Sequence, residues 1–376
     1  MTRAAVSRGS FIPDRVAAPM PSWRVPIEAR SEEMYPLPLA GTVEVHRLES
    51  RVLKGNPWED PADRDLPVYL PPSGTTKGLP LLVMLSGYTG TGGENFQRGL
   101  FLRDSLGGRL DRLIRTRRAP EAVMVSPNCI TTLGGSQYLN SSATGRYEDY
   151  VVDEVVPWVR RKYGTGPTAV LGTSSGGYGA MVLALRHPDL FSALATDAGD
   201  AYFEYCYPPD FPPAFRELRA AGGPEPFLRE MFRHPVDGFG PAHPKAQAIS
   251  TLAYASCYSP IESEPGRFDV PFDLETGALR EDVWARWLAW DPVRMVARPP
   301  YAEAARKLAT VYVCGGRKDE FGLDVSARIF AEAARRQGAK VEFEEFDGGH
   351  FDKAPRYDTI YVRLLTALGF PPPSRL

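Results

Sequence analysis

Cysteine and histidine are scarce in this chain of 376 residues, which contains four cysteines and five histidines. The cysteines form no C-x-x-C pair and show no other zinc-like spacing, so the sequence offers no metal site of that kind. We expect the four thiols to be reduced and buried, because free cysteine behaves as a small apolar residue. They are Cys129, Cys206, Cys257 and Cys314.

An excess of charge and a long apolar run are also missing. The 44 basic and 46 acidic residues leave a net charge of -2, and no polybasic run argues for nucleic acid or an anionic membrane as a partner. No segment approaches the ~20 apolar residues that span a bilayer, and residues 1–8 lack the apolar core of a signal peptide. These absences predict a cytoplasmic protein.

What the chain does contain is a rhythm of apolar runs and helical segments. We expect an antiparallel strand pair over 41–53 and 64–70, followed by alternating strands and helices. Near-continuous apolar strands predict an α/β fold with a mostly parallel central sheet and helices on both faces. The strands are expected at 79–85, 122–125, 169–171, 191–196, 309–314 and 340–346, and the helices at 147–163, 177–185, 325–336 and 358–368.

Two segments fall outside this rhythm. Residues 1–40 are rich in proline and charge and are expected to form an N-terminal arm. Residues 201–305 are rich in proline and aromatic residues, and they interrupt the body formed by 41–200 and 306–376. An insertion after a strand's carboxyl end lies where open α/β sheets bind ligands, so 201–305 is predicted to be a lid.

The segment Gly172-Thr173-Ser174-Ser175-Gly176 follows an apolar strand and precedes a helix of small residues. A serine in such a turn has a strained backbone and an exposed hydroxyl, with the free N–H groups of a helix start beside it. Ser174 is therefore the candidate nucleophile.

A serine nucleophile needs an imidazole that accepts its proton. Four of the histidines are badly placed: His46 lies on the edge strand, His187 ends the serine's own helix, and His234 and His243 lie in the insertion. His350 follows the last strand in a glycine loop, at the sheet edge where the serine is expected. It is the candidate general base.

The carboxylate that orients the histidine should follow a strand between the serine and the histidine. Asp319 meets this condition directly after the strand at 309–314, with Glu320 and then Asp324 as alternatives, or the acidic pair is only solvated turn material. The order Ser174, Asp319, His350 is that of an α/β-hydrolase.

Two backbone donors should stabilise the oxyanion of the tetrahedral intermediate. We expect them to be the N–H groups of Ser175 and of Tyr88, the latter in the glycine-rich loop after the strand at 79–85. That loop lacks the G-K-[ST] ending of a phosphate-binding P-loop. Asp200, Tyr202 and Phe203 are predicted to line the substrate side, unless the aromatic residues only pack the lid onto the body.

These motifs resemble the esterase D group of α/β-hydrolases, which includes S-formylglutathione hydrolases, enterochelin esterases, feruloyl esterases and mycolyltransferases. Similarity over 85–96 and 172–180 carries the resemblance, which covers roughly 42–200 and 308–368. The segments 55–57, 147–150, 319–322 and 347–350 are more similar to the enterochelin-esterase-like putative esterases. The resemblance implies ester hydrolysis through an acyl-enzyme, with neither a metal nor an organic cofactor.

The expected function is that of a serine carboxylesterase that acts on a small-molecule ester. Acyl transfer and hydrolysis of a thioester, as in S-formylglutathione hydrolases, would use the same three residues and stay open as alternatives. The long insertion and the residues flanking Ser174 depart from the S-formylglutathione hydrolases. A hydrolase scaffold that only binds a ligand usually lacks a member of the triad, and none is missing here. A homo-oligomer also stays open.

Overall fold

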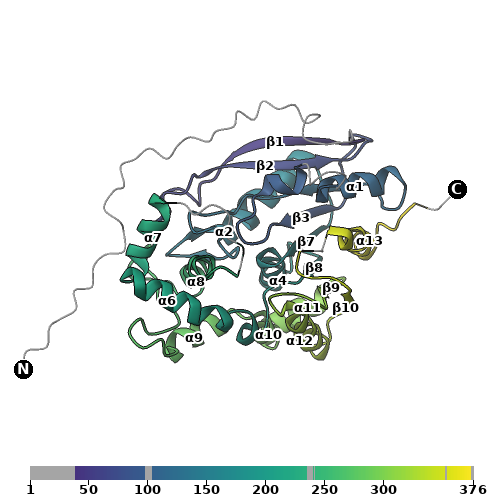
Figure 1. Cartoon of the computed structure of the whole chain (residues 1–376). Coiled ribbons are helices and arrows are strands. Elements are labelled where there is room, and N and C mark those ends of the chain that lie inside the picture. The colour runs from purple at the N-terminus through teal and green to yellow at the C-terminus, as the bar shows by residue number, and fades with distance from the viewer. Residues whose placement is uncertain (1–38, 98–103, 235–239, 241, 352–353, 374–376) are drawn as a thin grey trace, which may run out of the picture.

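The computed structural model describes residues 39–97, 104–234, 240, 242–351 and 354–373 (Figure 1). The predicted arm over 1–40 lies outside the described residues except for its last two positions. Figure 1 shows one sheet running through the molecule, with helices on both of its sides.

The central sheet has eight strands in the order β1-β2-β4-β3-β7-β8-β9-β10. The strands β1 and β2 are antiparallel at one edge, β2 pairs antiparallel with β4, and every later pairing is parallel. This arrangement confirms the predicted, mostly parallel sheet. The strands span Thr42–Glu49, Asp63–Leu70, Leu81–Leu85, Val123–Val125, Thr168–Thr173, Ala193–Asp197, Val311–Gly316 and Val341–Phe346.

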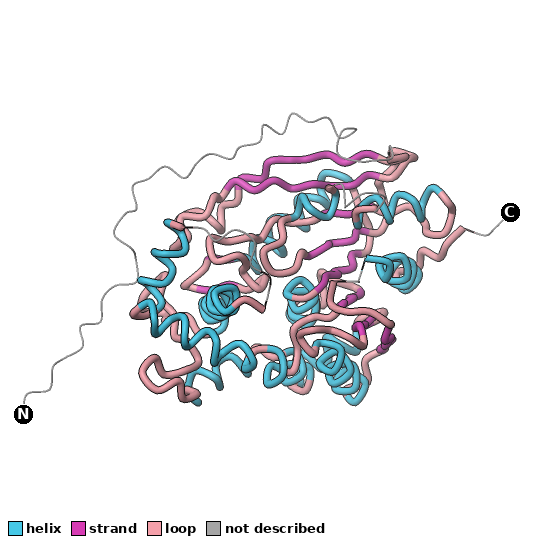
Figure 2. The backbone as a smooth tube through the Cα atoms, viewed as in Figure 1, coloured by secondary structure: helices cyan, strands magenta, loops and turns pink. Residues whose placement is uncertain are grey.

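Alternation along the strands divides the core into two layers, one on each face of the sheet. In β3, Leu81, Val83 and Leu85 point into one layer, whereas Leu82 and Met84 point into the other. Figure 2 shows the strands as a central ribbon between the two groups of helices. The second layer is covered by α1 (Leu106–Arg115) and α13 (Tyr357–Ala367) and the first by α4 (Ser175–Arg186) and α12 (Leu323–Arg336).

The helix predicted over 147–163 contains a wider turn that the sequence pattern did not indicate. It consists of α2 (Tyr147–Asp149), the π-helical segment Tyr150–Val155, and α3 (Val156–Tyr163). Pro157 has no N–H, and its ring would clash with the carbonyl four residues earlier in a regular α-helix. The widened turn removes this conflict, because the N–H of Val156 bonds the carbonyl of Val151, five residues back.

The segment predicted as a lid enters after β8 and leaves before β9, and it is mainly helical. Its apolar side chains belong to the same buried cluster as α4 and α12. The helices α5 to α11 span Phe203–Cys206, Phe211–Ala221, Pro224–Arg233, Pro244–Tyr258, Glu281–Leu288, Pro292–Val296 and Pro299–Lys307.

The short elements of the whole described chain are the 3-10 turns Gly92–Phe96, Pro208–Asp210 and Ala354–Arg356 and the strand pair Asn140–Ser141 and Gly145–Arg146.

The sheet topology decides where the chemistry can gather. Because β7, β8, β9 and β10 are parallel neighbours, the loops that follow them emerge at one edge of the sheet. Three of these loops carry the residues that the sequence predicted as a triad. Among the described residues, no helix is both long enough and apolar enough to cross a membrane.

Candidate active site

Ser174 lies between the end of β7 and the start of α4, in a conformation that non-glycine residues rarely adopt. Its backbone has φ 55° and ψ -129°, and the side chain is only half-buried. Its N–H donates to the carbonyl of Asp197, and its own carbonyl accepts from Tyr178 at 2.9 Å. The turn therefore holds the Ser174 hydroxyl at the sheet edge, as the nucleophile elbow requires.

Close backbone contacts explain the glycines on both sides of Ser174. A Cβ at Gly176 would overlap the carbonyl of Leu85, and one at Gly172 would overlap the carbonyl of Gly176. The start of α4 can thus pack directly on the end of β3 only because these side chains are absent. The sequence predicted a tight turn here, and the structure shows the contact that requires it.

The two predicted oxyanion donors lie beside Ser174. Ser175 opens α4, and the first N–H groups of a helix have no acceptor within it. A Cβ at Gly87 would lie 3.5 Å from the Cβ of Ser174, so the loop that carries Tyr88 adjoins the serine. Within the described part of the chain, the backbone N–H of Tyr88 donates to no protein acceptor. The phenol of Tyr88 donates to the carbonyl of Leu133 at 2.7 Å and anchors the loop.

His350 and Asp319 form a buried hydrogen-bonded pair. Nδ1 of His350 lies 2.7 Å from Oδ2 of Asp319, and the two side chains are 4% and 0% exposed. Oδ1 of the same carboxylate accepts from the N–H groups of Phe321 and Leu323 at the start of α12. The carboxylate is thereby fixed from both sides, and its contact with Nδ1 leaves Nε2 as the imidazole nitrogen that can exchange a proton with a hydroxyl.

Glu320, the alternative acid, has a different role. Its Oε2 accepts the backbone N–H of His350 at 2.7 Å, so it holds the histidine loop without contacting the imidazole. Two backbone hydrogen bonds join the same loops. The N–H of Arg317 donates to the carbonyl of Phe346, and the N–H of Lys318 donates to the carbonyl of Gly348. The carboxylate and histidine loops therefore form one unit.

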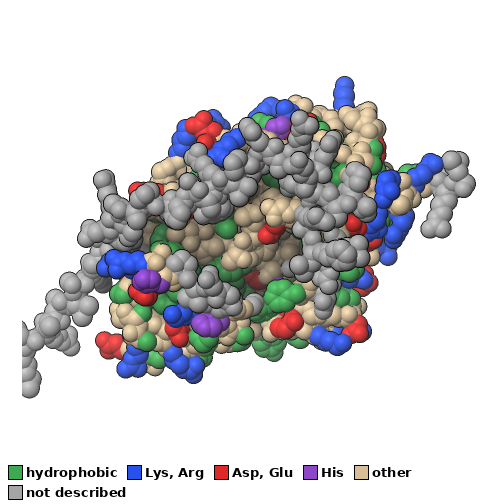
Figure 3. Space-filling model, turned by 45° about the horizontal axis from the view of Figure 1, so that its top comes forward, with side chains coloured by type: hydrophobic (Ala, Val, Ile, Leu, Met, Phe, Trp, Pro, Cys, Tyr) green, Lys and Arg blue, Asp and Glu red, His purple; other side chains and the backbone are tan. Residues whose placement is uncertain are grey.

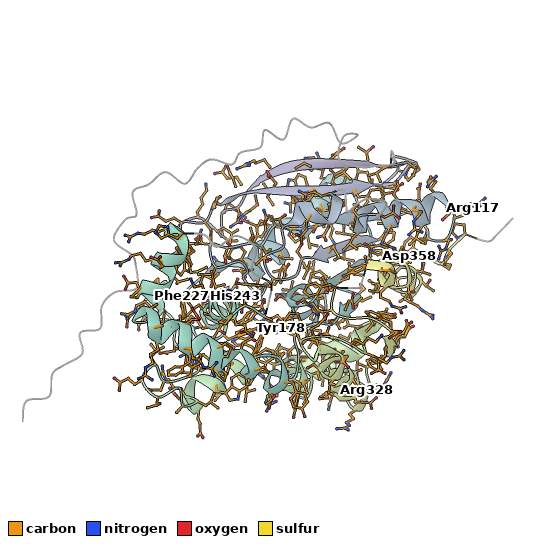
Figure 4. The ribbon with its side chains drawn as sticks, in the orientation of Figure 1. Arg117, Tyr178, Phe227, His243, Arg328 and Asp358 are labelled. Carbon is orange, nitrogen blue, oxygen red and sulfur yellow. The ribbon has the colours of Figure 1, made fainter. Side chains whose placement is uncertain are left out.

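The three residues predicted on the substrate side have different environments. Asp200 is buried, and its Oδ2 lies 3.4 Å from the hydroxyl of Ser175. Phe203 is fully buried and packs on Tyr178 and Tyr258, which favours the packing interpretation for this residue. Tyr202 is only half-buried. Figure 4 labels Tyr178, which lies near the centre of the molecule.

The sequence analysis missed a group of polar side chains around Asp200. Gln137 donates to the Asp200 carboxylate at 3.1 Å, and Tyr207 donates to the same oxygen at 3.0 Å. Tyr258 lies 2.9 Å from the Tyr207 hydroxyl and 2.8 Å from the Gln137 amide nitrogen. These residues come from distant parts of the chain. The positive φ of Gln137, 49°, cannot be read from the sequence.

The cysteines and other polar groups suggest no second centre. The structure has four free cysteines, and burial raises the pKa of Cys129 and of Cys257 to about 12. Cys206 is only half-buried, unlike the other three. Over the described ranges, no three His, Cys, Asp or Glu side chains gather as metal ligands would. A surface hollow of about 410 Å³ lies elsewhere, between the end of α6 and the turn at 274–275.

Comparison with solved structures shows an α/β-hydrolase fold. A ferulic acid esterase superimposes with a TM-score of 0.53 and 21% identity, covering 87% of this chain and 98% of that one. An S-formylglutathione hydrolase from Agrobacterium tumefaciens gives a TM-score of 0.50 and 15% identity, covering 89% and 98%. FphF, a fluorophosphonate-binding serine hydrolase from Staphylococcus aureus, gives 0.50 and 16%, covering 87% and 97%.

Sequence comparison gives the family. The MPT51 antigen of Mycobacterium leprae (strain TN) is 33% identical over 92 residues, which cover 20% of this chain and 31% of that protein. The match therefore spans about a third of this relative's length. The model of the family described as "Putative esterase" matches residues 61–355, more than half of the chain and including the elbow and both loops that meet it. The chain therefore belongs to the Putative esterase family.

Proposed function

We propose that this protein is a serine carboxylesterase with the triad Ser174, Asp319 and His350. The observation that carries the proposal is the buried pair of His350 and Asp319, on loops at the same sheet edge as the strained Ser174. A half-buried hydroxyl, an imidazole held by a carboxylate, and two free backbone donors are the parts that acyl transfer through a serine requires. The membership in an esterase family supports the same reaction.

In the acylation step, Oγ of Ser174 attacks the carbonyl carbon of the ester while Nε2 of His350 takes the hydroxyl proton. The carbonyl π electrons move onto oxygen, and the N–H groups of Tyr88 and Ser175 stabilise the resulting oxyanion. Collapse of this intermediate breaks the bond to the alcohol oxygen, which receives the proton from His350. Asp319 stabilises the imidazolium that exists between these transfers.

Deacylation repeats the sequence with water. His350 takes a proton from water, and the hydroxide oxygen adds to the acyl carbon of the Ser174 ester. The second oxyanion occupies the same donors, and the serine oxygen leaves with the proton held by His350. The products are the carboxylic acid and the free enzyme.

A fluorophosphonate probe tests the nucleophile directly. We expect the probe to label the wild-type protein, and peptide mapping to place the label on Ser174. The protein should also hydrolyse p-nitrophenyl acetate, and Ser174→Ala should lower turnover by about 10⁴-fold or more, because the triad acts as a unit. A folded Ser174→Ala protein with near-wild-type turnover would show that another residue is the nucleophile.

Acyl transfer to an alcohol or amine is the alternative that uses the same residues. Competition between water and an added acceptor separates the two reactions, because hydrolysis yields only acid whereas transfer yields the new ester or amide. We propose hydrolysis as the main outcome. The likeness to the enterochelin-esterase-like branch, the lid function of 201–305, the cytoplasmic location and a homo-oligomer stay predictions of the sequence.

A further inference from the structure

A buried carboxylate stands beside the proposed nucleophile and has no part in the triad. Asp200 is 4% exposed, and its Oδ2 receives hydrogen bonds from Gln137 at 3.1 Å and Tyr207 at 3.0 Å, with the Ser175 hydroxyl at 3.4 Å. Ser175 adjoins Ser174 in the chain. The carboxylate therefore contacts the side chain of the residue that follows the proposed nucleophile.

In the described part of the chain, this carboxylate has no cation in direct contact. Among the described residues, Asp200 forms no ion pair with a lysine, an arginine or a histidine. Burial raises the pKa of Asp200, while the hydrogen bonds from Gln137 and Tyr207 and the charge of His350 act in the opposite direction. Burial is the larger effect, so the pKa of Asp200 is raised, and the three donors to one oxygen only partly offset it. A carboxylate also has about four lone-pair positions, so acceptor capacity is left over.

Tyrosine rings lead from the oxyanion loop to this carboxylate. The ring of Tyr254 lies 5.5 Å from that of Tyr88 and 4.8 Å from that of Tyr207, whose hydroxyl bonds Asp200. Tyr88 and Tyr254 are half-buried as residues, whereas Tyr207 is buried. The face of a tyrosine ring attracts cations, most strongly where water is excluded.

An amide oxygen beside Asp200 has no hydrogen-bond partner in the part of the chain that the structure describes. Gln137 is buried, and its Oε1 has no hydrogen-bond partner, although its amide nitrogen bonds Asp200, Tyr207 and Tyr258. The backbone that places these groups is strained, with φ 49° at Gln137 and 47° at Ala198, two residues before Asp200. Strain of this kind persists only where the surrounding structure enforces it. The site thus combines negative charge, unused acceptors and aromatic faces.

We propose that the enzyme prefers esters that carry a positively charged ammonium group, which Asp200 and the tyrosine wall of Tyr88, Tyr207 and Tyr254 bind next to Ser174. This inference rests on the proposed esterase function and deepens it by naming the substrate class. A buried, ionised carboxylate without an ion-pair partner attracts a cation more strongly than a neutral group of the same shape. The same field disfavours an anionic substrate.

Pairs of esters that differ only in one charge test this preference. On the acyl side, p-nitrophenyl 4-(trimethylammonio)butyrate is compared with p-nitrophenyl 5,5-dimethylhexanoate, and on the alcohol side acetylcholine is compared with 3,3-dimethylbutyl acetate. We expect kcat/KM to favour the cation about tenfold or more in at least one pair. Asp200→Asn keeps an acceptor for Gln137 and Tyr207 but removes the charge, so the preference should fall about tenfold.

Two further variants complete the test. Asp282→Asn makes the same change in net charge on an exposed side chain of α9 and should leave the preference as in the wild type. Tyr254→Leu removes the half-buried ring and should lower the preference several-fold, a readout that does not depend on the folding of the Asp200 variant.

Equal kcat/KM within both pairs in the wild type, or a preference that survives Asp200→Asn in a folded protein, would overturn the inference. If Asp200→Asn lowers the rates of cationic and neutral esters equally, Asp200 acts on His350 and not on the substrate, which also overturns it. Failure of the wild type to hydrolyse any ester, neutral ones included, would instead count against the proposed esterase function.

Discussion

Two neighbouring carboxylates contact the same histidine, and the atoms that they touch separate their roles. Asp319 meets the imidazole at Nδ1, whereas Glu320 meets only the backbone N–H of His350, each at 2.7 Å. A carboxylate on the imidazole fixes its tautomer and stabilises its charged form. A carboxylate on the backbone can only fix the position of the loop.

We therefore expect Asp319→Asn to lower kcat for p-nitrophenyl acetate by roughly 10⁴-fold, because the amide cannot stabilise the imidazolium. Glu320→Gln should lower it by less than about tenfold, since an amide oxygen can still accept the His350 N–H. Steady-state rates of the two variants, with circular dichroism as the check on folding, decide the assignment. A larger loss in Glu320→Gln would make Glu320 the acid of the triad.

At the scale of elements, the segment 201–305 contains side chains with two kinds of role. Phe203 opens α5 and is fully buried, with the rings of Tyr207 and Tyr258 at 4.7 and 5.2 Å. Tyr202, one position earlier, is half-buried and packs edge-on against the exposed Tyr205. The two neighbours should thus respond differently to truncation.

Phe203→Ala should destabilise the protein by about 3–5 kcal/mol, because it leaves a cavity among aromatic rings. Tyr202→Ala should change the unfolding midpoint little but alter the relative kcat/KM of short and long esters several-fold, since each buried methylene contributes about 0.8 kcal/mol. Urea unfolding and an ester-length series measure the two effects. A uniform loss over all esters in folded Tyr202→Ala would contradict its predicted position on the substrate side.

The start of α6 carries a carboxyl group whose ionisation should make stability depend on pH. Burial raises the pKa of Asp210 from 3.8 to about 6, although Gln247 donates a hydrogen bond to it. The favourable field of the helix N-terminus does not offset the loss of hydration. The folded state binds this proton more tightly than the unfolded state. The stabilisation of the folded state by this proton is therefore complete below about pH 4 and is lost as pH rises through about 6.

Asp210→Asn should remove this dependence while its amide oxygen still accepts from Gln247. At pH 8 the variant should be more stable than the wild type by up to roughly 3 kcal/mol, at about 1.4 kcal/mol per pKa unit. At pH 4 the difference should be small. Urea midpoints of both proteins between pH 4 and pH 8 test the sign, and a variant that is less stable at pH 8 would contradict it.

At the scale of the whole molecule, one carboxylate links helices from opposite ends of the chain. Asp358 in α13 lies 3.1 Å from Arg109 and 3.0 Å from Arg112, both in α1, and all three side chains are mostly buried (Asp358 is labelled in Figure 4). Elsewhere, acidic and basic side chains are interspersed over the face shown in Figure 3. Ion pairs between exposed side chains, such as Arg47 with Asp65, should add little to stability.

Asp358→Asn should lower the free energy of unfolding by about 1–2 kcal/mol, because Arg109 loses its counter-charge and Arg112 keeps only Asp104. Glu49→Gln, which breaks an exposed pair with Lys54, should change it by less than about 0.5 kcal/mol. Chemical unfolding of both variants gives the comparison. Equal effects would show that α13 is held on α1 by apolar contacts alone.

The sequence predicted the framework of the fold but not the polar side chains that surround Asp200, for a physical reason. Apolar runs fix strands such as β3 and β9, and the elbow and the histidine loop have local signatures at Ser174 and His350. The surroundings of Asp200 have no such signature, because Gln137, Tyr207 and Tyr258 meet only through the fold. The sequence also did not indicate the widened turn before Pro157. A helical pattern of apolar residues does not show whether a backbone N–H bonds the carbonyl four or five residues earlier.

The order of the strands also has a consequence for synthesis on the ribosome. The elbow of Ser174 emerges well before β9 and β10, which bring Asp319 and His350, and β8 can pair with β9 only after the intervening insertion has been made. Domains generally fold as units as the chain grows from its N-terminus. With the proposed triad, a nascent chain carries its serine long before it has the base that would activate it, and we expect reactivity toward esters only after the last strand has docked.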